Sequence, residues 1–425
     1  MITVSGELLH RLAYAPGSYP VPVTCWDGGD AYTILHDEVS PTAAGGTIHI
    51  APNGREVDVS MIGAPNDCVR IIVKSTDAGD GSRKDQDSAR LLSATGYAVR
   101  DGQWHETPVQ VVPVLTELFS RNSGLLENGV LADKRVFVAG LGSGGAPTVI
   151  ELAKSGVMHF DLLDHDRLEV ANVARHMAGL SHVGRYKTKF LADAIREKDP
   201  YAEVRTWEIK VSWQNLEPIR KLVREADLVV CATDSRESRI ILNKLCVAEK
   251  KTLIIAGAFR RAYGGQILRV RPGISLCYQC FLEAVPDRAR DQEISSAEAA
   301  KRLAYTDRPV PIEPGLSTDI APISLMVTKL AIQELLRGRK TTLDSLHEDL
   351  VAPWYLWLNR RERKTQYAHL KPLEFEIGGL HVLRWYGIAA ERNPACPVCG
   401  DFVGEMAKRY GLEPPPDHEE TVVAP

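Results

Sequence analysis

The sequence predicts an α/β protein built on a doubly wound, largely parallel sheet with helices on both faces. Between about residue 135 and residue 260, apolar runs typical of buried strands alternate with segments of helical periodicity. This alternation favours a parallel sheet that is covered on both sides. A glycine-rich turn also joins the first of these strands to the next helix, as in sheets that bind nucleotides at the carboxyl ends of their strands.

Composition bounds the class of protein. The chain has 425 residues, enough for two or three domains with a substantial core. The net charge is −4 with acidic and basic residues interspersed, so we expect neither a nucleic acid nor a membrane as partner. There is no apolar run of about 18 residues and no signal-peptide pattern, which predicts a cytoplasmic protein.

The chain is expected to divide into four parts. They are a smaller N-terminal α+β domain with an accessory or docking role, the domain with the parallel sheet, a C-terminal extension and a disordered tail: residues 1–115, 116–340, 341–412 and 413–425. Within the first part, residues 47–50 and 57–60 alternate like strands on either side of an Asn53-Gly54 turn signal. The charged segment Asp287 to Arg308 is predicted to cross over the site.

A glycine-rich turn organises the larger domain. Gly140, Gly142 and Gly145 form a G-x-G-x-x-G pattern after the apolar run at residues 136–139. Small residues let the backbone approach phosphates, and the N-terminus of the following helix favours negative charge. Asp164 ends the next apolar run, where it is placed to accept hydrogen bonds from ribose hydroxyls. These features predict a Rossmann-like nucleotide site, and the glycine pattern alone is shared with NAD and FAD sites.

The polar residues after Asp164 favour ATP. The pattern Asp164-x-Asp166-x5-Asn172-x2-Arg175 sets two carboxylates, an amide and a guanidinium beside the same pocket. Cleavage of ATP between its α and β phosphates uses such groups to stabilise charge, whereas hydride transfer does not need them. An NAD oxidoreductase is therefore the weakest alternative.

With this motif, residues 119 to 340 resemble the ThiF/MoeB superfamily, which includes the ubiquitin-activating enzymes. The resemblance implies adenylation of a C-terminal carboxylate with MgATP, by a domain that works as a homodimer. It also implies roles for the residues that match the family pattern: Gly140, Gly142 and Gly145 would cradle the nucleotide, Asp164 would hold the ribose, and Asn172, Arg175 and Lys187 would bind the phosphates.

Two basic residues need separate comment. Arg121 matches a family arginine that reaches ATP across the dimer interface, and an ordinary surface arginine is the alternative. Lys187 opens a predicted helix, where the helix dipole disfavours a positive charge, so we expect a functional role there. In place of the family's Arg-Gln ending the chain has Arg175-His176, and we assign no proton transfer to His176.

Asp234 follows the predicted strand at residues 228–232 and resembles the family's acidic residue near magnesium and the acyl phosphate. Together with Asp166 it would orient Mg²⁺ and the incoming carboxylate. A helix N-cap is the simpler interpretation of Asp234, and one residue can serve both purposes.

Two C-x-x-C pairs, Cys277 with Cys280 and Cys396 with Cys399, predict a tetrahedral zinc site despite the long gap between them. Such a site is closed, so its zinc would be structural and would tie the C-terminal extension to the main domain. Cysteines paired in this way suit a reducing compartment.

The expected acyl-accepting cysteine is missing. Where one subgroup of the family has its cysteine, five residues before Pro322, this chain has Ser317, and no cysteine lies between Cys280 and Cys396. Three explanations remain open. The enzyme stops at the acyl-adenylate, or Cys25 or Cys68 acts as a distant nucleophile, or Ser317 forms an oxyester with help from Asp319. Ordinary helix capping by the Ser-Thr-Asp run is the structural alternative.

We therefore expect an adenylyltransferase that activates a ubiquitin-like protein for transfer to a conjugating-enzyme-like partner. Its cofactors would be ATP, Mg²⁺ and structural zinc. One alternative is a sulfur-carrier-protein adenylyltransferase of the thiamin or molybdopterin type, although the large N-terminal part fits it less well. The other is a non-catalytic Rossmann scaffold subunit, which the combination of Asp164, Arg175, Lys187 and Asp234 disfavours.

Overall fold

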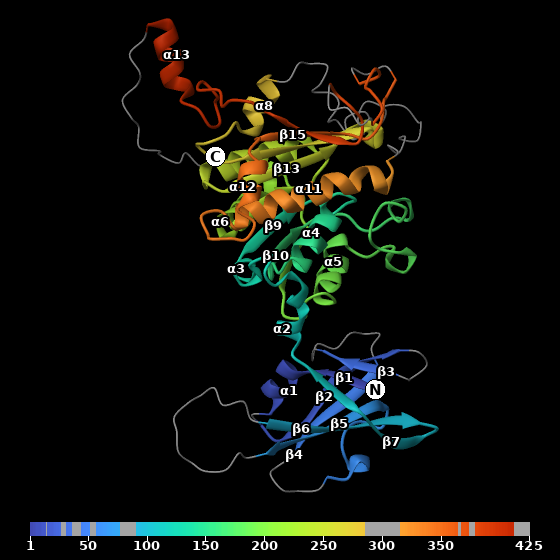
Figure 1. The fold of residues 1–425 in the computed structure, drawn as a ribbon. Coiled ribbons are helices and arrows are strands. Elements are labelled where there is room, and N and C mark those ends of the chain that lie inside the picture. The colour runs from blue at the N-terminus through green and yellow to red at the C-terminus, as the bar shows by residue number, and fades with distance from the viewer. Residues whose placement is uncertain are drawn as a thin grey trace, which may run out of the picture. The chain divides into compact units, whose positions relative to one another are not determined.

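The computed structural model describes residues 1–13, 15–26, 31–35, 44–51, 57–76, 91–284, 315–363, 367–373 and 379–411. The predicted turn at Asn53-Gly54, the crossover segment Asp287 to Arg308 and the tail 413–425 lie outside these residues. The chain forms two compact units, Met1–Arg121 and Asn122–Pro425 (Figure 1). In the described residues, no helix has the length and apolar character needed to cross a membrane.

The N-terminal unit is an eight-stranded mixed sheet with the strand order β7-β6-β5-β4-β2-β3-β1-β8 in the described residues. The strands are β1 (Ile2–Ser5), β2 (Gly17–Trp26), β3 (Ala31–Ile34), β4 (Ala44–Ala51), β5 (Asp67–Thr76), β6 (Leu91–Arg100), β7 (Gln103–Thr107) and β8 (Val109–Val112). Leu8 and Leu9 of helix α1 (Gly6–Leu12) are buried with apolar residues of the sheet. Helix α2 (Val114–Leu118) and the 3-10 turn η2 (Ser120–Asn122) follow the last strand.

The strand expected at residues 57–60 is wrong. Val59–Met61 instead forms a 3-10 turn, η1. The Asp58 carboxylate accepts hydrogen bonds from the Ser60 backbone N–H at 2.9 Å and from its hydroxyl at 2.7 Å. Short polar side chains favour such local bonds over sheet pairing, which the alternating apolar pattern did not reveal.

The second unit confirms the predicted fold class. Its sheet has the order β11-β10-β9-β12-β13-β14-β15-β16 in the described residues. The strands are β9 (Arg135–Ala139), β10 (His159–Leu163), β11 (Glu203–Trp207), β12 (Leu228–Cys231), β13 (Thr252–Ala258), β14 (Gly264–Val270), β15 (Trp354–Leu358) and β16 (Arg384–Ile388). From β11 to β13 all neighbours pair in parallel, and from β13 to β16 they pair antiparallel.

Helices cover both faces of this sheet (Figure 1). One face carries α4 (Gly145–Lys154), α5 (Lys187–Arg196) and α11 (Ser317–Leu335), and the other carries α6 (Leu216–Glu225), α7 (Arg236–Ala248) and α8 (Tyr278–Ala284). Alternate residues of β9 enter the two cores, with Val136 and Val138 on the first face and Phe137 and Ala139 on the second. Shorter helices are α3 (Asn128–Ala132), α12 (Ser345–Asp349) and α13 (Phe402–Tyr410).

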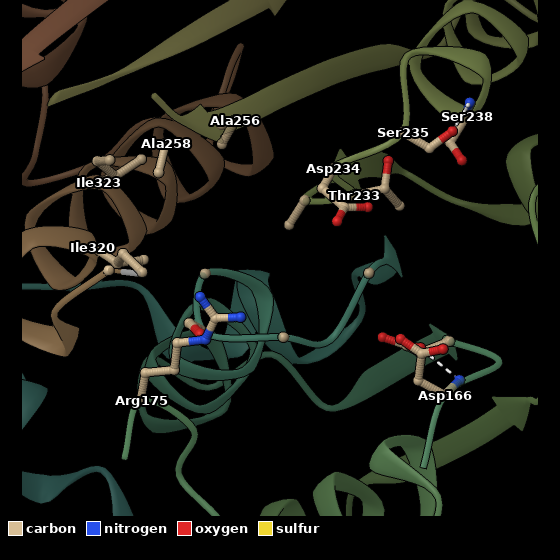
Figure 2. A pocket seen from close by; sticks show the side chains of 18 of the residues that line it. Asp166, Arg175, Thr233, Asp234, Ser235, Ser238, Ala256, Ala258, Ile320 and Ile323 are labelled. Carbon is tan, nitrogen blue, oxygen red and sulfur yellow. Dashed lines mark hydrogen bonds between the residues drawn. The ribbon is translucent and has the colours of Figure 1, made fainter. Parts of the chain in front are cut away.

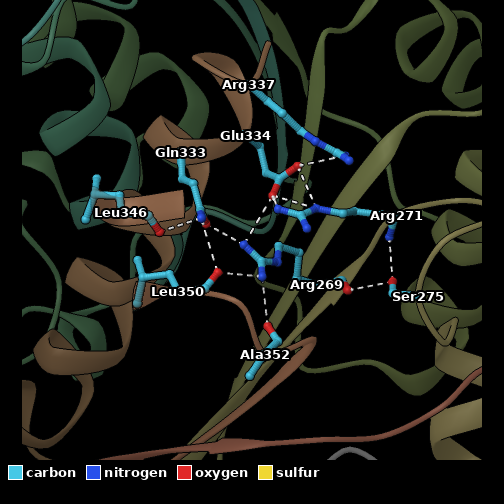
Figure 3. Close-up of polar contacts among 9 residues, drawn as sticks. All are labelled: Arg269, Arg271, Ser275, Gln333, Glu334, Arg337, Leu346, Leu350 and Ala352. Carbon is cyan, nitrogen blue, oxygen red and sulfur yellow. Dashed lines mark hydrogen bonds and ion pairs between the residues drawn. The ribbon is translucent and has the colours of Figure 1, made fainter. Parts of the chain in front are cut away.

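A buried ionic network fixes the carboxyl-terminal end of α11 to β14 (Figure 3). Arg269 is 1% exposed, and its guanidinium donates to the side chains of Gln333 and Glu334 and to the carbonyl oxygens of Leu350 and Ala352. Each of the two terminal nitrogens of the Arg269 guanidinium thus meets two acceptors. Such bonds offset much of the free-energy cost of burying a guanidinium.

The strand order also sets the place of a ligand site. Strands β10 and β12 lie on opposite sides of β9, so the connections after β9 and β12 leave the sheet in opposite directions. Such a switch point opens a crevice at the carboxyl ends of the strands. The loops after β9, β10, β12 and β13 all reach this edge.

Candidate active site

The crevice is a pocket of about 870 Å³. Eight of the residues predicted for nucleotide and phosphate binding line it: Gly140, Gly142, Asp164, Asp166, Asn172, Arg175, Lys187 and Asp234. Figure 2 shows Asp166 and Arg175 on different sides of the pocket, with Thr233 and Asp234 on the wall that follows β12.

The three glycines of the turn differ in what they do. Gly140 has φ +88°, and a Cβ there would lie 2.7 Å from the Ala232 carbonyl carbon. A Cβ on Gly145 would lie 1.9 Å from the Gly140 carbonyl oxygen, so this residue closes the turn on itself and is not among the described residues that line the pocket. A Cβ on Gly142 would meet nothing within 4 Å. Two glycines therefore shape the turn, and Gly142 leaves open space beside it.

Asp164 ties the end of β10 to the glycine-rich turn. Its carboxylate is largely buried, with Oδ2 accepting from the Leu141 backbone N–H at 2.8 Å and Oδ1 accepting from the Asp166 N–H at 2.9 Å. Each oxygen of an ionised carboxylate has a further lone pair, so these bonds leave room for hydroxyl donors from a ligand.

His176 forms a hydrogen bond to the same turn. Its Nε2 lies 2.9 Å from the Leu141 carbonyl oxygen, and its Nδ1 accepts from the Ala178 N–H at 3.0 Å. Only the neutral ring with the proton on Nε2 satisfies both bonds. Burial, followed by the charge of Lys187, lowers the pKa of His176 against the opposing effect of the Leu141 carbonyl. His176 is thus a neutral structural residue at the pocket.

Lys187 and Asp166 form an ion pair on the pocket wall. The Lys187 ammonium lies 2.9 Å from Asp166 Oδ2 although the lysine is only 7% exposed at the start of α5. Burial raises the pKa of Asp166, but hydrogen bonding and charge from Lys187, with a smaller effect of His165, outweigh it and lower the pKa overall. The pair places a positive charge at a helix N-terminus where the helix alone would disfavour it.

Asn172 and Arg175 come from the segment after β10. Asn172 ends the 3-10 turn η3 (Val170–Asn172), and its Oδ1 accepts from the Glu169 N–H at 3.1 Å in a capping box. The Arg175 side chain lies toward Ile320 of α11 (Figure 2). A Cβ built on Gly315, just before α11, would be 3.9 Å from the Arg175 guanidinium. Arg175 therefore borders the part of the pocket walled by α11.

Asp234 is exposed on the pocket wall and does not cap α7. The N-cap is Ser235, whose hydroxyl accepts from the Ser238 N–H at 3.4 Å, so the capping interpretation of Asp234 is wrong. Buried Arg239 donates to the Thr233 carbonyl at 3.0 and 3.2 Å and holds the loop beside Asp234. Arg239 itself had no predicted role, although its position on the first turn after a strand end gave a usable signal.

Ser317 and Arg121 occupy different surroundings. Ser317 is the first residue of α11 and is exposed, and it is absent from the described lining of the pocket. Leu316 is the N-cap of α11 without a side-chain bond, so the capping interpretation of the Ser-Thr-Asp run is wrong. The carboxylate of Asp319, which was proposed to assist Ser317, is instead paired with the Arg360 guanidinium. Arg121 lies exposed in η2, at the end of the N-terminal unit.

The four predicted cysteines converge. Sγ–Sγ distances are 3.9 Å for Cys277–Cys280, 3.7 Å for Cys277–Cys396 and 3.4 Å for Cys280–Cys399. A tetrahedral Zn²⁺ site with Zn–S bonds near 2.3 Å requires sulfur atoms about 3.8 Å apart. All four sulfur atoms lie within 4.8 Å of one another, so the donor set fits a four-thiolate metal site that joins α8 to the segment before α13.

A group of basic residues on the pocket wall was missed from the sequence. Lys210, Arg236, Arg260 and Arg261 line the pocket beyond the predicted phosphate ligands. Arg260 and Arg261 could have been found from the sequence, because only Phe259 separates them from the apolar strand β13, and the carboxyl ends of parallel strands meet at one edge of a sheet.

Comparison with known sequences identifies relatives of the second unit. The sequence profile of the ThiF family matches residues 120–364. Uncharacterized protein y4oA of Sinorhizobium fredii (strain NBRC 101917 / NGR234) is 27% identical over 215 residues, covering 48% of this chain and 36% of that protein. The adenylyltransferase and sulfurtransferase MOCS3 of Culex quinquefasciatus is 32% identical over 174 residues, covering 40% of this chain and 39% of that protein. The chain thus spans well under two thirds of the length of these relatives.

Solved structures give a more distant likeness. E. coli MccB bound to MccA-N7isoASN has a TM-score of 0.47 and 19% identity, covering 64% of this chain and 69% of that one. E. coli MccB with ATP has a TM-score of 0.46 and 18% identity, covering 64% of this chain and 68% of that one. At these values the likeness concerns the fold alone.

Proposed function

Because this chain belongs to the ThiF family, we propose that it transfers AMP from MgATP to a carboxylate and releases pyrophosphate. The observation that carries the proposal is that the glycine-rich turn, Asp164, the Asp166–Lys187 pair and Asp234 line one pocket at the switch point of the sheet. A site of this kind offers backbone space for phosphates, acceptors for a ribose and charges of both signs.

The nucleotide would lie along the loops after β9 and β10. Asp164 would accept hydrogen bonds from ribose hydroxyls while keeping its bonds to the turn. The space beside Gly142 would admit the phosphates. Lys187 would then exchange part of its contact with Asp166 for a phosphate oxygen, which a flexible ammonium does more readily than a guanidinium.

The reaction is a displacement at the α-phosphorus. An oxygen of the substrate carboxylate bonds to phosphorus as the bond to the bridging oxygen breaks, and the electron pair leaves with pyrophosphate. Arg175, Asn172 and Lys187 would stabilise the negative charge that grows on the phosphate oxygens, which is the main catalytic contribution in such sites. No general base is needed, because the attacking carboxylate is already ionised near neutral pH.

We propose that a magnesium ion also binds in the pocket. Mg²⁺ prefers carboxylate oxygens and water in an octahedral shell, and Asp166 and Asp234 present carboxylates on the pocket wall. When bound, the ion would neutralise phosphate charge. The four-cysteine cluster would hold zinc in a structural role.

For the substrate, we propose the C-terminus of a ubiquitin-like protein, with a conjugating-enzyme-like protein as the receiver of the acyl group. A homodimer in which the partner subunit's Arg121 reaches the phosphates is part of this proposal. A second candidate is activation of a sulfur-carrier protein of the thiamin or molybdopterin type, which is supported by relatives named adenylyltransferase and sulfurtransferase.

Transfer after adenylation has three candidate routes. Direct passage of the acyl group to a partner's nucleophile is favoured, because Asp319 is paired with Arg360 and cannot readily activate Ser317. Intact-protein mass after incubation with MgATP and the ubiquitin-like partner tests this. An adduct that survives dithiothreitol in the wild type and is absent in Ser317→Ala would establish the oxyester instead. An adduct that dithiothreitol removes would point to Cys25 or Cys68.

The adenylation step is tested by acceptor-dependent exchange of labelled pyrophosphate into ATP. Wild-type protein is expected to catalyse exchange, and Asp234→Asn is expected to reduce the rate by about a hundredfold or more. Asp349→Asn, the same change at an exposed position of α12, serves as the matched control and should exchange normally. Equal rates for wild type and Asp234→Asn would contradict the assigned site, and the scaffold alternative predicts no exchange by any variant.

A further inference from the structure

Two buried hydroxyl groups lie at hydrogen-bond distance from one carbonyl of the glycine-rich turn. The Gly144 carbonyl oxygen accepts from the Ser324 hydroxyl at 2.9 Å and lies 3.0 Å from the Thr148 hydroxyl. Thr148 belongs to α4, whereas Ser324 belongs to α11 and lies 180 residues after Gly144 in the chain. Thr148 is 1% exposed and Ser324 is 2% exposed, and both line the pocket. Helix α11 therefore holds the end of the turn directly.

Ser324 is polar on a helix whose buried face is mostly apolar. Ile323, Val327 and Leu330 of α11 are buried in the core that α11 shares with α4 (Figure 1). The Thr148 hydroxyl also lies 3.3 Å from the Ser324 carbonyl oxygen, so a small polar group joins the two helices among these apolar contacts. A buried hydroxyl with a partner adds little net stability, but it fixes the geometry of the groups that it joins.

The glycine-rich turn needs such a restraint because packing does not confine it. Four of the six residues from Gly140 to Gly145 are glycine. A Cβ on Gly142 would meet nothing within 4 Å in the described part of the chain, and a Cβ on Gly144 would make only ordinary contacts, the nearest at 3.9 Å. Ordering a glycine costs more conformational entropy than ordering any other residue. Hydrogen bonds to the backbone are thus the means of ordering Gly144.

Holding the Gly144 carbonyl also orients the amide that follows it. The peptide unit is planar and trans, so the N–H of Gly145 points opposite to this carbonyl. The carbonyl lies toward Thr148, one turn further along α4, and the N–H accordingly points toward the N-terminal end of the helix. N–H groups at this end favour a phosphate. The two hydroxyls therefore set the direction of a backbone donor at the place where phosphates would lie.

We propose that Ser324 and Thr148 position the glycine-rich turn for the phosphates of the nucleotide. The inference rests on the proposed adenylation. Both side chains act through the Gly144 carbonyl and are positioning residues. They order the turn before the nucleotide arrives, so that less conformational entropy is lost when the phosphates bind. The ribose, which Asp164 would hold, depends on them much less.

The test compares Kd values for ATP and for adenosine, measured by calorimetry. Ser324→Ala and Thr148→Val each remove one hydroxyl near the Gly144 carbonyl, and each is expected to weaken ATP binding about fivefold. Adenosine, which carries no phosphate, should bind both variants almost as it binds the wild type. The two variants alter different helices, so either one decides the matter if the other fails to fold.

Thr328→Val is the matched control within α11. The Thr328 hydroxyl is also buried, but it donates to the Ser324 carbonyl at 3.0 Å and is absent from the described lining of the pocket. Its removal should leave both Kd values unchanged. In pyrophosphate exchange, Ser324→Ala is expected to raise KM for ATP about fivefold with little change in kcat, because the lost restraint acts on binding.

Unchanged ATP affinity in Ser324→Ala and Thr148→Val would overturn the inference and leave adenylation intact. An equal loss of affinity for ATP and adenosine would also overturn it, because general loosening of the fold would then explain the effect. A fall in kcat without any change in Kd for ATP would contradict a positioning role. Failure of the wild-type protein to bind ATP at all would contradict adenylation itself.

Discussion

At the scale of single residues, the protonation state of His176 is expected to make the stability of the fold around the glycine-rich turn depend on pH. Its two ring bonds require the neutral form, and burial lowers its pKa below the ordinary value of 6.5. Between the folded and unfolded pKa values the folded state binds fewer protons, so stability rises with pH through that range. The contribution of His176 is full above pH 6.5 and is lost as pH falls through the lower folded pKa.

Wild-type protein is therefore expected to lose ATP affinity and stability as the pH falls below 6.5. The His176→Gln variant is expected to lose less of both over the same pH range. A glutamine amide can still donate to the Leu141 carbonyl and does not titrate in this range. The measurement is Kd for ATP and the thermal midpoint from pH 5 to 8, for both proteins. A wild-type decline that is identical in His176→Gln would mean that other groups control it.

Asp199 gives a second prediction at this scale. It is fully buried, its Oδ1 accepts from the Tyr201 N–H at 3.0 Å, and its Oδ2 has no partner in the described part of the chain. Burial raises the pKa of Asp199 above 3.8, so the carboxylate destabilises the fold once pH rises through the raised value.

Asp199→Asn is expected to stabilise the protein by about 1 kcal/mol at pH 7.5, a gain that disappears near pH 3.8. Thermal or urea unfolding at the two pH values measures it. A variant that is less stable than wild type at pH 7.5 would show that a cation or water pairs with the carboxylate.

Some residue-level features could be read from the sequence and others could not. The spacing after β10 brought Asp164, Asp166 and Arg175 to one pocket, because the carboxyl ends of parallel strands meet there. The sequence did not decide whether Asp234 or Ser235 caps α7, since both residue types are good caps and the choice depends on where the strand ends. The Asp166–Lys187 pair depends on loop closure between β10 and α5, which spacing does not specify.

At the scale of elements, α11 is held at both ends. Asp319 near its start pairs with Arg360, and Gln333 and Glu334 near its end meet Arg269 of β14. Between these anchors Ile320, Ile323 and other residues of α11 wall the pocket. The position of this wall therefore depends on an ionic network remote from the chemistry.

Arg269→Met is expected to destabilise the protein by about 3–5 kcal/mol, because it leaves buried acceptors without their donor. Arg337→Met removes an arginine 4.0 Å from the same Glu334 but 44% exposed, and is expected to change stability by at most about 1 kcal/mol. Urea unfolding of the two variants makes the comparison. Similar losses in both would mean that the buried bonds of Arg269 contribute little.

Periodicity predicted the parallel strands well because buried strands β9, β12 and β13 are nearly continuous apolar runs. It failed at residues 57–60, where local bonds of Asp58 replaced sheet pairing. Sequence pattern also gave no register for the antiparallel strands β14 to β16, which are joined by long segments and not by hairpin turns.

At the scale of the whole molecule, the cysteine cluster joins distant parts of the second unit. Cys277 and Cys280 lie at α8, whereas Cys396 and Cys399 lie more than a hundred residues later. The C-x-x-C spacing allowed the set to be predicted without knowing the path between its halves. The mainly β character of the first compact unit, Met1–Arg121, was beyond what sequence patterns report.

Purified protein is expected to hold about one zinc per chain, and Cys399→Ser is expected to lose it together with several kcal/mol of stability. Metal analysis and thermal unfolding before and after chelation measure both effects. Cys246→Ser, at a buried cysteine outside the cluster, is the control for loss of a thiol without loss of metal. Zinc-free protein of unchanged stability would contradict the structural role.

The most direct measurement of the central claim is the identity of the nucleotide product under single-turnover conditions with a carboxylate acceptor and hydroxylamine as a trap. The proposed displacement predicts AMP and pyrophosphate, together with an acceptor converted to its C-terminal hydroxamate, and none of these with Asp234→Asn. Formation of ADP and phosphate, or consumption of ATP without any hydroxamate, would contradict adenylation in this pocket.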